Sequence, residues 1–351
     1  MKLIQQYQEI AKIFNEGYFL GIFHHWDTDG IASAALILKK YKDQIAAMMT
    51  PRIGFYSEEA INIMSVPRDV DYVIFLDYGI NGEDYKRIHG KLNKPLIVID
   101  HHLAEPWCNS GDSIYCNPVA LGVGDEAEYP STTYLLSKIL GVKDEHDVML
   151  IALGIIGDLA PYFDAGISHR GLEYFRKLVT NTKVDMITLR RAADILDSCY
   201  RIYKGVCIEH AVRKLAFENI EAIMSDAYLF KTYNLSKEIM LKALKNLDKV
   251  FSNVKISVYY LCMDAYVTSY VGRKLAKDNP DKIIVLVHEI PRIDGGFIYI
   301  RSIKRTLKSL IKNLRKEGFK VGGKEKVAVI EFIGGYEDTL RRVIDELEVD
   351  A

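Results

Sequence analysis

Three short apolar runs near the start of the chain constrain its fold more than any other feature. They are YFLGIF (18–23), YVIFL (72–76) and PLIVI (95–99). None shows the alternation of apolar and polar residues that marks a strand with one wet face, so each is predicted to be a strand buried on both faces. Helical patterns such as IASAALILKKY (31–41) lie between them. This alternation predicts an α/β domain with a doubly wound, mainly parallel sheet.

Charged and imidazole side chains follow each of these runs directly. They are His24, His25, Asp27 and Asp29 after the first run, Asp77 after the second, and Asp100, His101 and His102 after the third. In an open parallel sheet, ligand groups gather just beyond the carboxyl ends of the strands. We therefore expect these residues to form one site.

The first motif, H-x-D-x-D, consists of His25, Asp27 and Asp29. If this segment is extended, its alternate side chains point the same way, so their ligand atoms converge. Gly30 is expected to permit a tight turn, and a helix beginning near Ile31 to present free N–H groups to an anion. The neighbouring His24 would then point away from the site and is predicted to pack in the core.

A further carboxylate, Asp158, lies in the run LGIIGDLAPY. Several carboxylates that converge repel one another, and some must bind protons unless cations neutralise them. Mixed His and Asp ligation suits Mn²⁺, with Mg²⁺, Co²⁺ or Zn²⁺ as alternatives. Two ions that share a bridging carboxylate would build a site that hydrolyses phosphoesters.

The length of 351 residues indicates more than one domain. Helical patterns dominate from about residue 166, and strand-like runs such as ISVYYLC (256–262) return from about residue 252. We predict an α/β domain over 1–165, a helical connector over 166–251, and a second, smaller α/β domain over 252–351.

The composition bears on where the protein is located and on what it could bind. The five cysteines are scattered and form no C-x-x-C pair, which indicates neither a disulfide framework nor a zinc ribbon and favours a reducing, cytoplasmic location. The amphipathic start MKLIQQYQEIAKIF is not typical of a signal peptide. No uninterrupted apolar run reaches about 18 residues, so no membrane partner is expected. The net charge of −1 does not indicate any class of binding partner. A surface that binds nucleic acid would have to be a local patch of positive charge.

Taken in order, the motifs H-W-D-T-D-G, D-Y-G, D-H-H and the later G-D resemble the four motifs of the DHH phosphoesterase superfamily. The resemblance is closest to the RecJ-like exonucleases and their oligonucleotide-degrading relatives. GFIYIRS (296–302) and the later VGGKEKVAV resemble the DHH-associated substrate domain of that family.

The resemblance implies roles for the residues of the four motifs. His25 and Asp27 would hold one Mn²⁺, and Asp29, His101 and Asp158 would hold a second, with Mg²⁺ or Co²⁺ as possible substitutes. The residues that act in catalysis would be Asp77, which bridges the two ions, Asp100, which orients His101, and His102, which contacts the scissile phosphate.

In the second domain the resemblance assigns substrate binding to Arg301, Gly322, Gly323 and Lys324. The family carries a histidine where this chain has Lys324, and lysine also binds phosphate, as a point charge. Between Arg301 and Lys326 there are ten Lys and Arg against two Glu, and such a local excess is what binding to a phosphate backbone requires.

The predicted function is therefore that of a manganese-dependent, RecJ-like exonuclease that cleaves single-stranded DNA or RNA from an end, in a cleft between the domains. One alternative is a phosphodiesterase for short oligonucleotides or a cyclic dinucleotide. Another is a scaffold in a replication assembly with residual activity, a role that the resemblance also implies. An active nuclease could still dock on a replication or repair protein.

Overall fold

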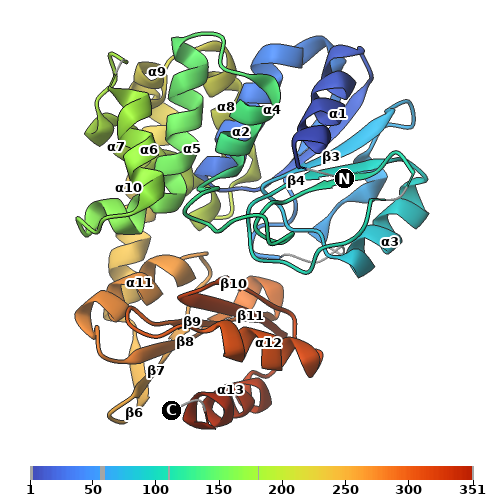
Figure 1. Ribbon diagram of the computed structural model, residues 1–351. Coiled ribbons are helices and arrows are strands. Elements are labelled where there is room, and N and C mark those ends of the chain that lie inside the picture. The colour runs from blue at the N-terminus through green and yellow to red at the C-terminus, as the bar shows by residue number, and fades with distance from the viewer. Residues whose placement is uncertain (1–2, 56–59, 110, 181, 350–351) are drawn as a thin grey trace. The chain divides into compact units, whose positions relative to one another are not determined.

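The structure is a computed structural model that describes residues 3–55, 60–109, 111–180 and 182–349. Its residues group into two compact units, 1–233 and 234–351 (Figure 1). Each unit is built around its own sheet, one of five strands and one of six.

The sheet of the first unit is parallel throughout and has the strand order β2-β1-β3-β4-β5. Its strands are β1 (Leu20–His24), β2 (Ile45–Met49), β3 (Tyr72–Leu76), β4 (Leu96–Ile99) and β5 (Ile114–Cys116). The three predicted runs form the central strands β1, β3 and β4, and nearly all of their residues are buried. The prediction of an α/β fold with a mainly parallel sheet is confirmed.

Five helices accompany this sheet: α1 (Leu3–Asn15), α2 (Thr28–Tyr41), α3 (Gly82–Leu92), α4 (Thr132–Leu140) and α5 (Glu145–Asp164). The chain leaves β1 toward β2 through α2, and it leaves β3 toward β4, on the opposite side, through α3. Because such crossovers are right-handed, α2 and α3 cover opposite faces of the sheet. The direction of winding therefore reverses between β1 and β3, where open α/β sheets bind ligands.

Helix α2 begins at Thr28, three residues earlier than predicted, because Asp27 caps it. The Asp27 side chain accepts a hydrogen bond from Gly30 N at 3.1 Å. Asp29 therefore lies in the first turn of the helix and not on an extended segment, which corrects the expectation. Gly30 is needed for space and not for a turn, since a Cβ there would lie 2.3 Å from the His25 carbonyl oxygen.

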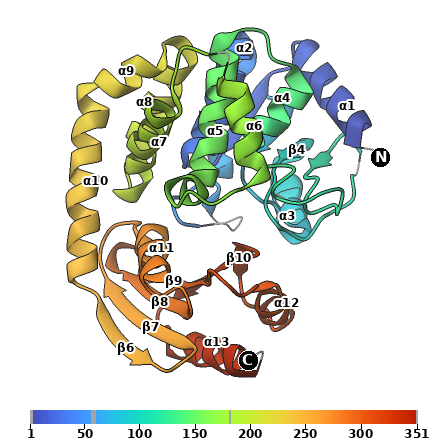
Figure 2. The ribbon, with the colours of Figure 1, turned by 60° about the vertical axis from the view of Figure 1, so that its left-hand side comes forward.

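Helix α5 is long and apolar enough to cross a membrane by length and composition, with a mean hydropathy of 1.3. The sequence shows no uninterrupted apolar run of this length because Asp147 and Asp158 lie within the helix. In the structure 61% of this stretch is buried, and α5 packs against α2, α4 and neighbouring helices (Figure 2). The packing of a core helix accounts for its composition.

The helices that follow are α6 (Arg170–Val179), α7 (Met186–Arg201), α8 (Gly205–Phe217) and α9 (Ile220–Ser225). They differ from the predicted separate connector, since α6 and α7 pack against α5 and α8 packs against α2. A disulfide joins Cys199 at the end of α7 to Cys207 at the start of α8. The scattered cysteines gave no indication of this pair, because only the turn between the helices brings the two Cα atoms to 5.4 Å.

Helix α10 (Ala227–Lys245) leads into the second unit, whose sheet has the order β10-β11-β9-β8-β7-β6. The strands are β6 (Asp248–Ser252), β7 (Ile256–Cys262), β8 (Ile283–Ile290), β9 (Gly295–Arg301), β10 (Val321–Lys324) and β11 (Val327–Ile333). Only β7 and β8 pair in parallel. The sequence KEIMLKALKNLDKVF (237–251) has a helical pattern throughout, but the helix ends at Lys245 and residues 248–252 form the edge strand β6.

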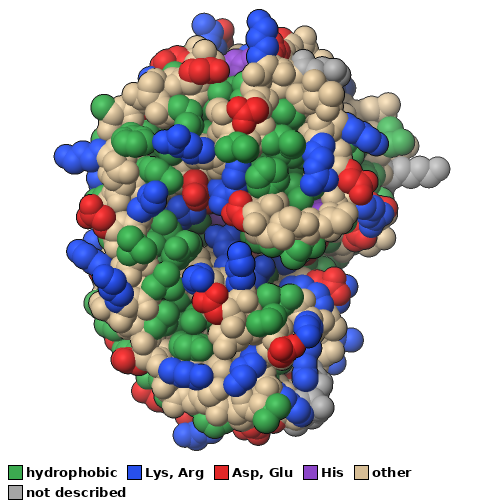
Figure 3. All heavy atoms as spheres, turned by 90° about the vertical axis from the view of Figure 1, so that its left-hand side faces the viewer, with side chains coloured by type: hydrophobic (Ala, Val, Ile, Leu, Met, Phe, Trp, Pro, Cys, Tyr) green, Lys and Arg blue, Asp and Glu red, His purple; other side chains and the backbone are tan. Residues whose placement is uncertain are grey.

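Two layers of helix cover this second sheet. Apolar side chains of α12 (Lys308–Lys316) and α13 (Glu337–Val349) pack on one face, and those of α11 (Thr268–Asp278) pack on the other. Helix α12 begins at Lys308, so the first basic residues of the segment from Arg301 to Lys326 precede it. Short 3₁₀ turns lie at Lys42–Gln44, Ile63–Ser65 and Pro291–Ile293. Basic, acidic and hydrophobic side chains are intermixed on the face seen in Figure 3.

Candidate metal centre

One cluster of ligand atoms forms where β1 and β3 end. His25 Nδ1 lies 2.9 Å from Asp27 Oδ1 and 3.6 Å from Asp77 Oδ2. The three side chains offer one imidazole nitrogen and two carboxylate oxygens within 4.8 Å of one another. Nitrogen and oxygen donors in this combination suit a divalent transition metal.

A second cluster joins the end of β4 to the helices α2 and α5. His101 Nε2 lies 2.8 Å from Asp158 Oδ2 and 4.0 Å from Asp29 Oδ2. These three residues also bring their ligand atoms within 4.8 Å of one another. A further group with the same spacing consists of Asp77, His101 and His102.

Asp77 lies between the two clusters. Its Oδ2 is 3.6 Å from His25 Nδ1, and its Oδ1 is 3.5 Å from His101 Nε2. The residue has a φ of 58°, a left-handed conformation that is uncommon for a non-glycine residue and is often found at functional sites. One carboxylate therefore faces both clusters, which is the arrangement that a ligand bridging two ions requires.

The start of helix α4 holds Asp29 in place. Thr132 N donates to Asp29 Oδ2 at 2.6 Å, and Thr133 N donates to Asp29 Oδ1 at 3.1 Å. The Thr132 hydroxyl also donates to Asp77 Oδ1 at 3.1 Å. Ser131 caps the same helix by accepting from Tyr134 N. Free N–H groups at this helix end thus bind a carboxylate of the protein itself.

Asp100 and the two histidines that follow it are held differently from the expectation. His102 Nδ1 donates to Asp100 Oδ1 at 2.8 Å, whereas His101 Nδ1 donates to the Tyr129 carbonyl oxygen at 3.0 Å. Asp100 therefore orients the imidazole of His102 and not that of His101. The reason is geometric, because His101 is fully buried and points toward Asp158, while the side chain of His102 is 30% exposed.

In the part of the chain that the structure describes, the buried carboxylates of the cluster lack a positive charge that would neutralise them. Burial and the nearby Asp158 raise the pKa of Asp29 to about 6, and burial together with Asp29 and Asp27 raises the pKa of Asp77 well above its usual range. No hydrogen-bond donor within the described ranges contacts Asp77 Oδ2, which is buried. A divalent cation would supply the missing positive charge, so the residues present fit a metal.

Two glycines of α5 let it approach α2 closely enough to build the second cluster. A Cβ at Gly154 would lie 2.3 Å from Asp29 Oδ1, and a Cβ at Gly157 would lie 2.7 Å from the Thr28 Cβ. Side chains at these positions would force apart the helices that carry Asp29 and Asp158.

His24 and several supporting residues complete the first unit's site. His24 is buried and donates from Nδ1 to the His25 carbonyl oxygen, and burial lowers its pKa to about 4. Asn117 Nδ2 donates to Asp100 Oδ2, and Asp197 accepts hydrogen bonds from Thr28. Sequence reasoning did not find Asn117, Tyr129 or Asp197, because each lies far along the chain from the motif that it supports.

The residues predicted to bind substrate lie in the second unit, at one end of three neighbouring strands. Arg301 of β9 pairs with Val327 of β11, which pairs with Lys324 of β10. Arg301 and Lys324 thus stand in one row across the sheet, about 9–10 Å apart at two strand spacings. Gly323 has a φ of 148°, and a Cβ there would lie 2.1 Å from the Val327 carbonyl oxygen. The neighbouring Gly322 is exposed.

Much of the basic segment is accessible. The exposed members are Lys304, Arg305, Lys308, Lys312, Lys316 and Lys320. Leu310, Ile311 and Leu314 of α12 face the core instead. Lys304 is paired with Asp281, so part of the positive charge is neutralised within the unit.

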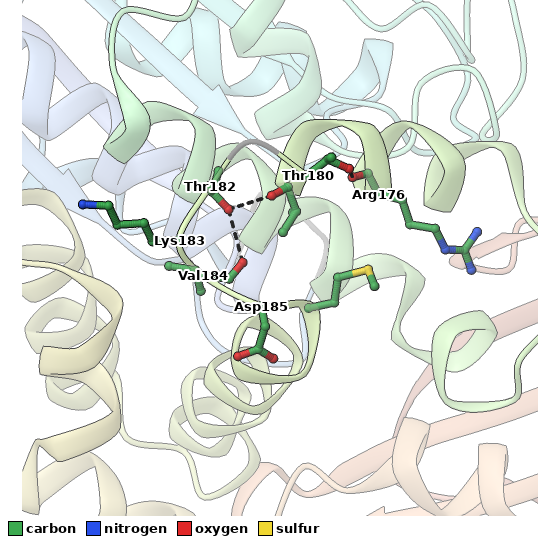
Figure 4. A pocket seen from close by; sticks show the side chains of 8 residues that line it. Arg176, Thr180, Thr182, Lys183, Val184 and Asp185 are labelled. Atoms are coloured by element: carbon green, nitrogen blue, oxygen red, sulfur yellow. Dashed lines mark hydrogen bonds between the residues drawn. The ribbon is translucent and has the colours of Figure 1, made fainter.

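A hollow of about 350 Å³ lies elsewhere, between α6 and α7 (Figure 4). It is lined by Arg176, Val179, Thr180, Thr182, Lys183, Val184, Asp185 and Met186. None of the predicted site residues lines it. Its polar groups serve local structure, since Asp185 caps α7 and the Thr182 hydroxyl bonds to backbone carbonyls.

Comparison with known proteins agrees with this arrangement. Residues 20–155 match the family described as the DHH family, N-terminal domain. The match covers the part of the chain that carries the first three motifs, and the chain as a whole has a RecJ-like fold. This confirms the resemblance drawn from the motifs.

Particular relatives are distant in sequence. An uncharacterized protein of Methanocaldococcus jannaschii is 24% identical over 234 residues, which cover 62% of this chain and 51% of that protein. The chain thus spans about half the length of this curated relative.

Among solved structures, a DHH domain described as belonging to a family of ribosomal proteins has a TM-score of 0.70 and 16% identity, and the match covers 99% of this chain and 90% of that chain. RecJ of Thermus thermophilus in complex with Mn²⁺ has a TM-score of 0.67 and 17% identity, with 99% and 54% covered. A pGpG-specific phosphodiesterase of Vibrio cholerae has a TM-score of 0.50 and 12% identity, with 95% and 100% covered.

Proposed function

We propose that the chain is a metal-dependent phosphodiesterase that hydrolyses single-stranded nucleic acid from an end, with Mn²⁺ as its metal. The observation that carries the proposal is the pair of ligand clusters that share Asp77. The DHH-family match supports a metal-dependent phosphoester hydrolase in general. The substrate class, cleavage from an end and the identity of the ion are the more specific parts of the proposal.

In this proposal His25 and Asp27 hold one ion, and Asp29, His101 and Asp158 hold the other, with Asp77 shared. Divalent ions bound there would supply Lewis acidity toward phosphoryl oxygens and a nucleophile at neutral pH. The carbonyl oxygen of Tyr129 fixes the His101 ring so that Nε2 faces the carboxylates.

His102 has the position expected of a residue that touches substrate. Asp100 accepts from its Nδ1, so Nε2 is turned away from Asp100, and the side chain is partly exposed. The charge and hydrogen bond of His102 outweigh the effect of burial and lower the pKa of Asp100. An ionised Asp100 stabilises a protonated His102, which can donate to a phosphoryl oxygen or to the leaving group.

The row formed by Arg301 and Lys324 is proposed to bind backbone or terminal phosphates of the substrate. Two cations at this separation match phosphate charges spaced along a nucleic-acid strand. The exposed lysines of the segment around α12 add an attraction to the phosphate backbone that does not depend on base sequence.

A phosphodiesterase for very short substrates is the second candidate. The pGpG-specific phosphodiesterase matches nearly the whole of this chain and is itself covered completely, which supports a dinucleotide-sized substrate as an alternative. A replication or repair partner, and a cytoplasmic location, remain further proposals drawn from the sequence.

A single time course tests the proposal. Single strands of DNA and of RNA, labelled separately at each end, and a dinucleotide would be incubated with the protein and Mn²⁺. We expect stepwise loss of nucleotides from one end of a long strand, and no product with a chelator. Cleavage of the dinucleotide alone would replace the exonuclease by the second candidate, and no hydrolysis of any phosphodiester would contradict both.

Variants of two aspartates make the test specific. Asp77→Asn removes the shared carboxylate charge and should lower activity at least about a thousandfold, since it disturbs both ions. Asp69→Asn is the matched control, because Asp69 is exposed and lies before the start of β3, whereas Asp77 follows the end of that strand. Equal loss in both variants would contradict the assigned site.

A further inference from the structure

Helix α7 contributes no predicted metal ligand, yet it is bonded to both helices that do. We propose that α7 is a brace that sets the position of α2 relative to α5, with Asp197 as its positioning residue. The inference rests on the proposed metal centre, since α2 carries Asp29 and α5 carries Asp158.

The contact with α2 is made at its first residue. Thr28 lies between Asp27 and Asp29, and both its backbone N–H and its hydroxyl donate to Asp197 Oδ1, at 3.1 and 2.6 Å. The first N–H groups of a helix have no acceptor within the helix. Asp27 caps the N–H of Gly30, and Asp197 takes that of Thr28 from another helix, so the turn that carries the ligands is fixed from two sides.

Asp197 is held in turn by a buried arginine. Arg201 is only 3% exposed, and its Nη2 lies 3.2 Å from Asp197 Oδ2 and 3.3 Å from Asp194 Oδ1. A buried guanidinium needs carboxylate partners, and this pairing keeps the Asp197 carboxylate in one orientation. The Thr28 hydroxyl also lies 3.0 Å from the Ala193 carbonyl oxygen of the same helix.

The contact with α5 is a two-point ion pair. Arg190 donates from Nε to Asp164 Oδ1 at 2.9 Å and from Nη2 to Asp164 Oδ2 at 2.7 Å. Paired contacts of this kind fix direction as well as distance. Arg190 Nη1 also lies 3.5 Å from Asp194 Oδ1, so Asp194 joins the two ends of the brace.

The consequence concerns the second ligand cluster, in which Asp29 of α2 and Asp158 of α5 must meet His101. Gly154 and Gly157 allow α2 and α5 to approach, but a glycine contact alone does not fix their relative rotation. The charged chain along α7 does so from outside the cluster. Loss of Asp197 should therefore weaken metal binding even though Asp197 is not a ligand.

The test measures Mn²⁺ binding by calorimetry on the full chain without substrate, beside the melting temperature of the metal-free protein. Asp197→Asn should weaken Mn²⁺ affinity about tenfold to a hundredfold, the range found when groups that orient metal ligands are removed. Thr28→Val, which lacks the hydroxyl, should show a loss in the same direction, and Thr28→Ser, which keeps it, should bind as the unaltered protein does. Glu209→Gln is the control, since it removes an exposed ion pair with Arg213 on α8.

The outcomes separate this inference from the proposed function. If Asp197→Asn lowers the melting temperature but leaves Mn²⁺ affinity unchanged, α7 is only structural and the inference is overturned. If that variant does not fold, the pair Thr28→Val and Thr28→Ser decides, and equal affinities overturn the inference. If the unaltered protein binds no Mn²⁺, the metal centre itself is overturned together with its brace.

Discussion

The two compact units differ in how closely their predicted functional residues are packed and in how exposed they are. In the first unit, carboxylates and imidazoles from three strand ends and two helices are packed within a few ångströms and are mostly buried. In the second, Arg301 and Lys324 stand two strands apart in one row, on a segment with many exposed lysines. Buried like charges in contact call for a cation, whereas spaced cations at a surface suit a chain of phosphates. In the proposed function, the first unit therefore carries the hydrolytic chemistry and the second binds the substrate.

The largest effect that sharpens this comparison is expected at His102. His102→Ala should lower kcat about a hundredfold to a thousandfold, because it removes a proton donor at the proposed phosphate position. Steady-state kinetics and Mn²⁺ calorimetry would be measured together, with His89→Ala on α3 as the control. If Mn²⁺ affinity falls as steeply as kcat, His102 is a ligand within the group of Asp77, His101 and His102 and not a residue that touches substrate.

The next effect concerns the second unit. Arg301→Gln and Lys324→Gln should each raise KM about tenfold or more with little change in kcat, since a charged contact to phosphate is lost. Both variants should also weaken the dependence of KM on salt concentration. Lys277→Gln, an exposed lysine on α11, provides the comparison. A fall in kcat with unchanged KM would contradict the proposal that the second unit binds substrate while the first unit carries out the chemistry.

A pH dependence follows from the first unit alone. The folded, metal-free protein raises the pKa of Asp29 to about 6, so it keeps a proton that the unfolded chain releases near pH 4. Stability of the metal-free protein should therefore fall as the pH rises from about 4 to 6. Metal binding must displace this proton, so Mn²⁺ affinity should fall as the pH drops below about 6. Affinity that is flat across this range would mean that Asp29 is not a ligand.

The smallest effect is one of stability and leaves both sites intact. Reducing the Cys199–Cys207 disulfide, which closes a short loop between α7 and α8, should lower the free energy of unfolding by about 2 to 3 kcal/mol. Denaturant unfolding with and without reductant would measure this. A simultaneous loss of Mn²⁺ affinity would show that the end of α7 matters to the metal centre as well.

The sequence could predict that the candidate residues of the first unit lie together because its signals are local. Strands such as β3 are continuous apolar runs. Asp77 directly follows β3 and His101 lies two residues after β4, so the parallel sheet alone brings them to one edge. The sequence could not show which partner each imidazole takes. Tyr129 holds His101 through a backbone carbonyl, which any residue type could offer.

Other features depended on long-range packing. The strands β2 and β5 lie at the edges of the sheet and are short or only partly buried, so their patterns are weak. The early start of α2 follows from a single cap by Asp27, and the link from Asp197 to Thr28 spans 169 residues. No spacing rule connects residues so far apart.

The central claim is that Asp77 joins two metal sites, and metal stoichiometry tests it most directly. The metal-free protein would be titrated with Mn²⁺, and binding would be monitored by calorimetry and by electron paramagnetic resonance. The account predicts two ions per chain and a spectrum of magnetically coupled manganese. Asp77→Asn should abolish the coupling and lower the affinity of both ions. Binding of a single ion, or two ions whose spectrum and affinities are unaffected by Asp77→Asn, would contradict the account.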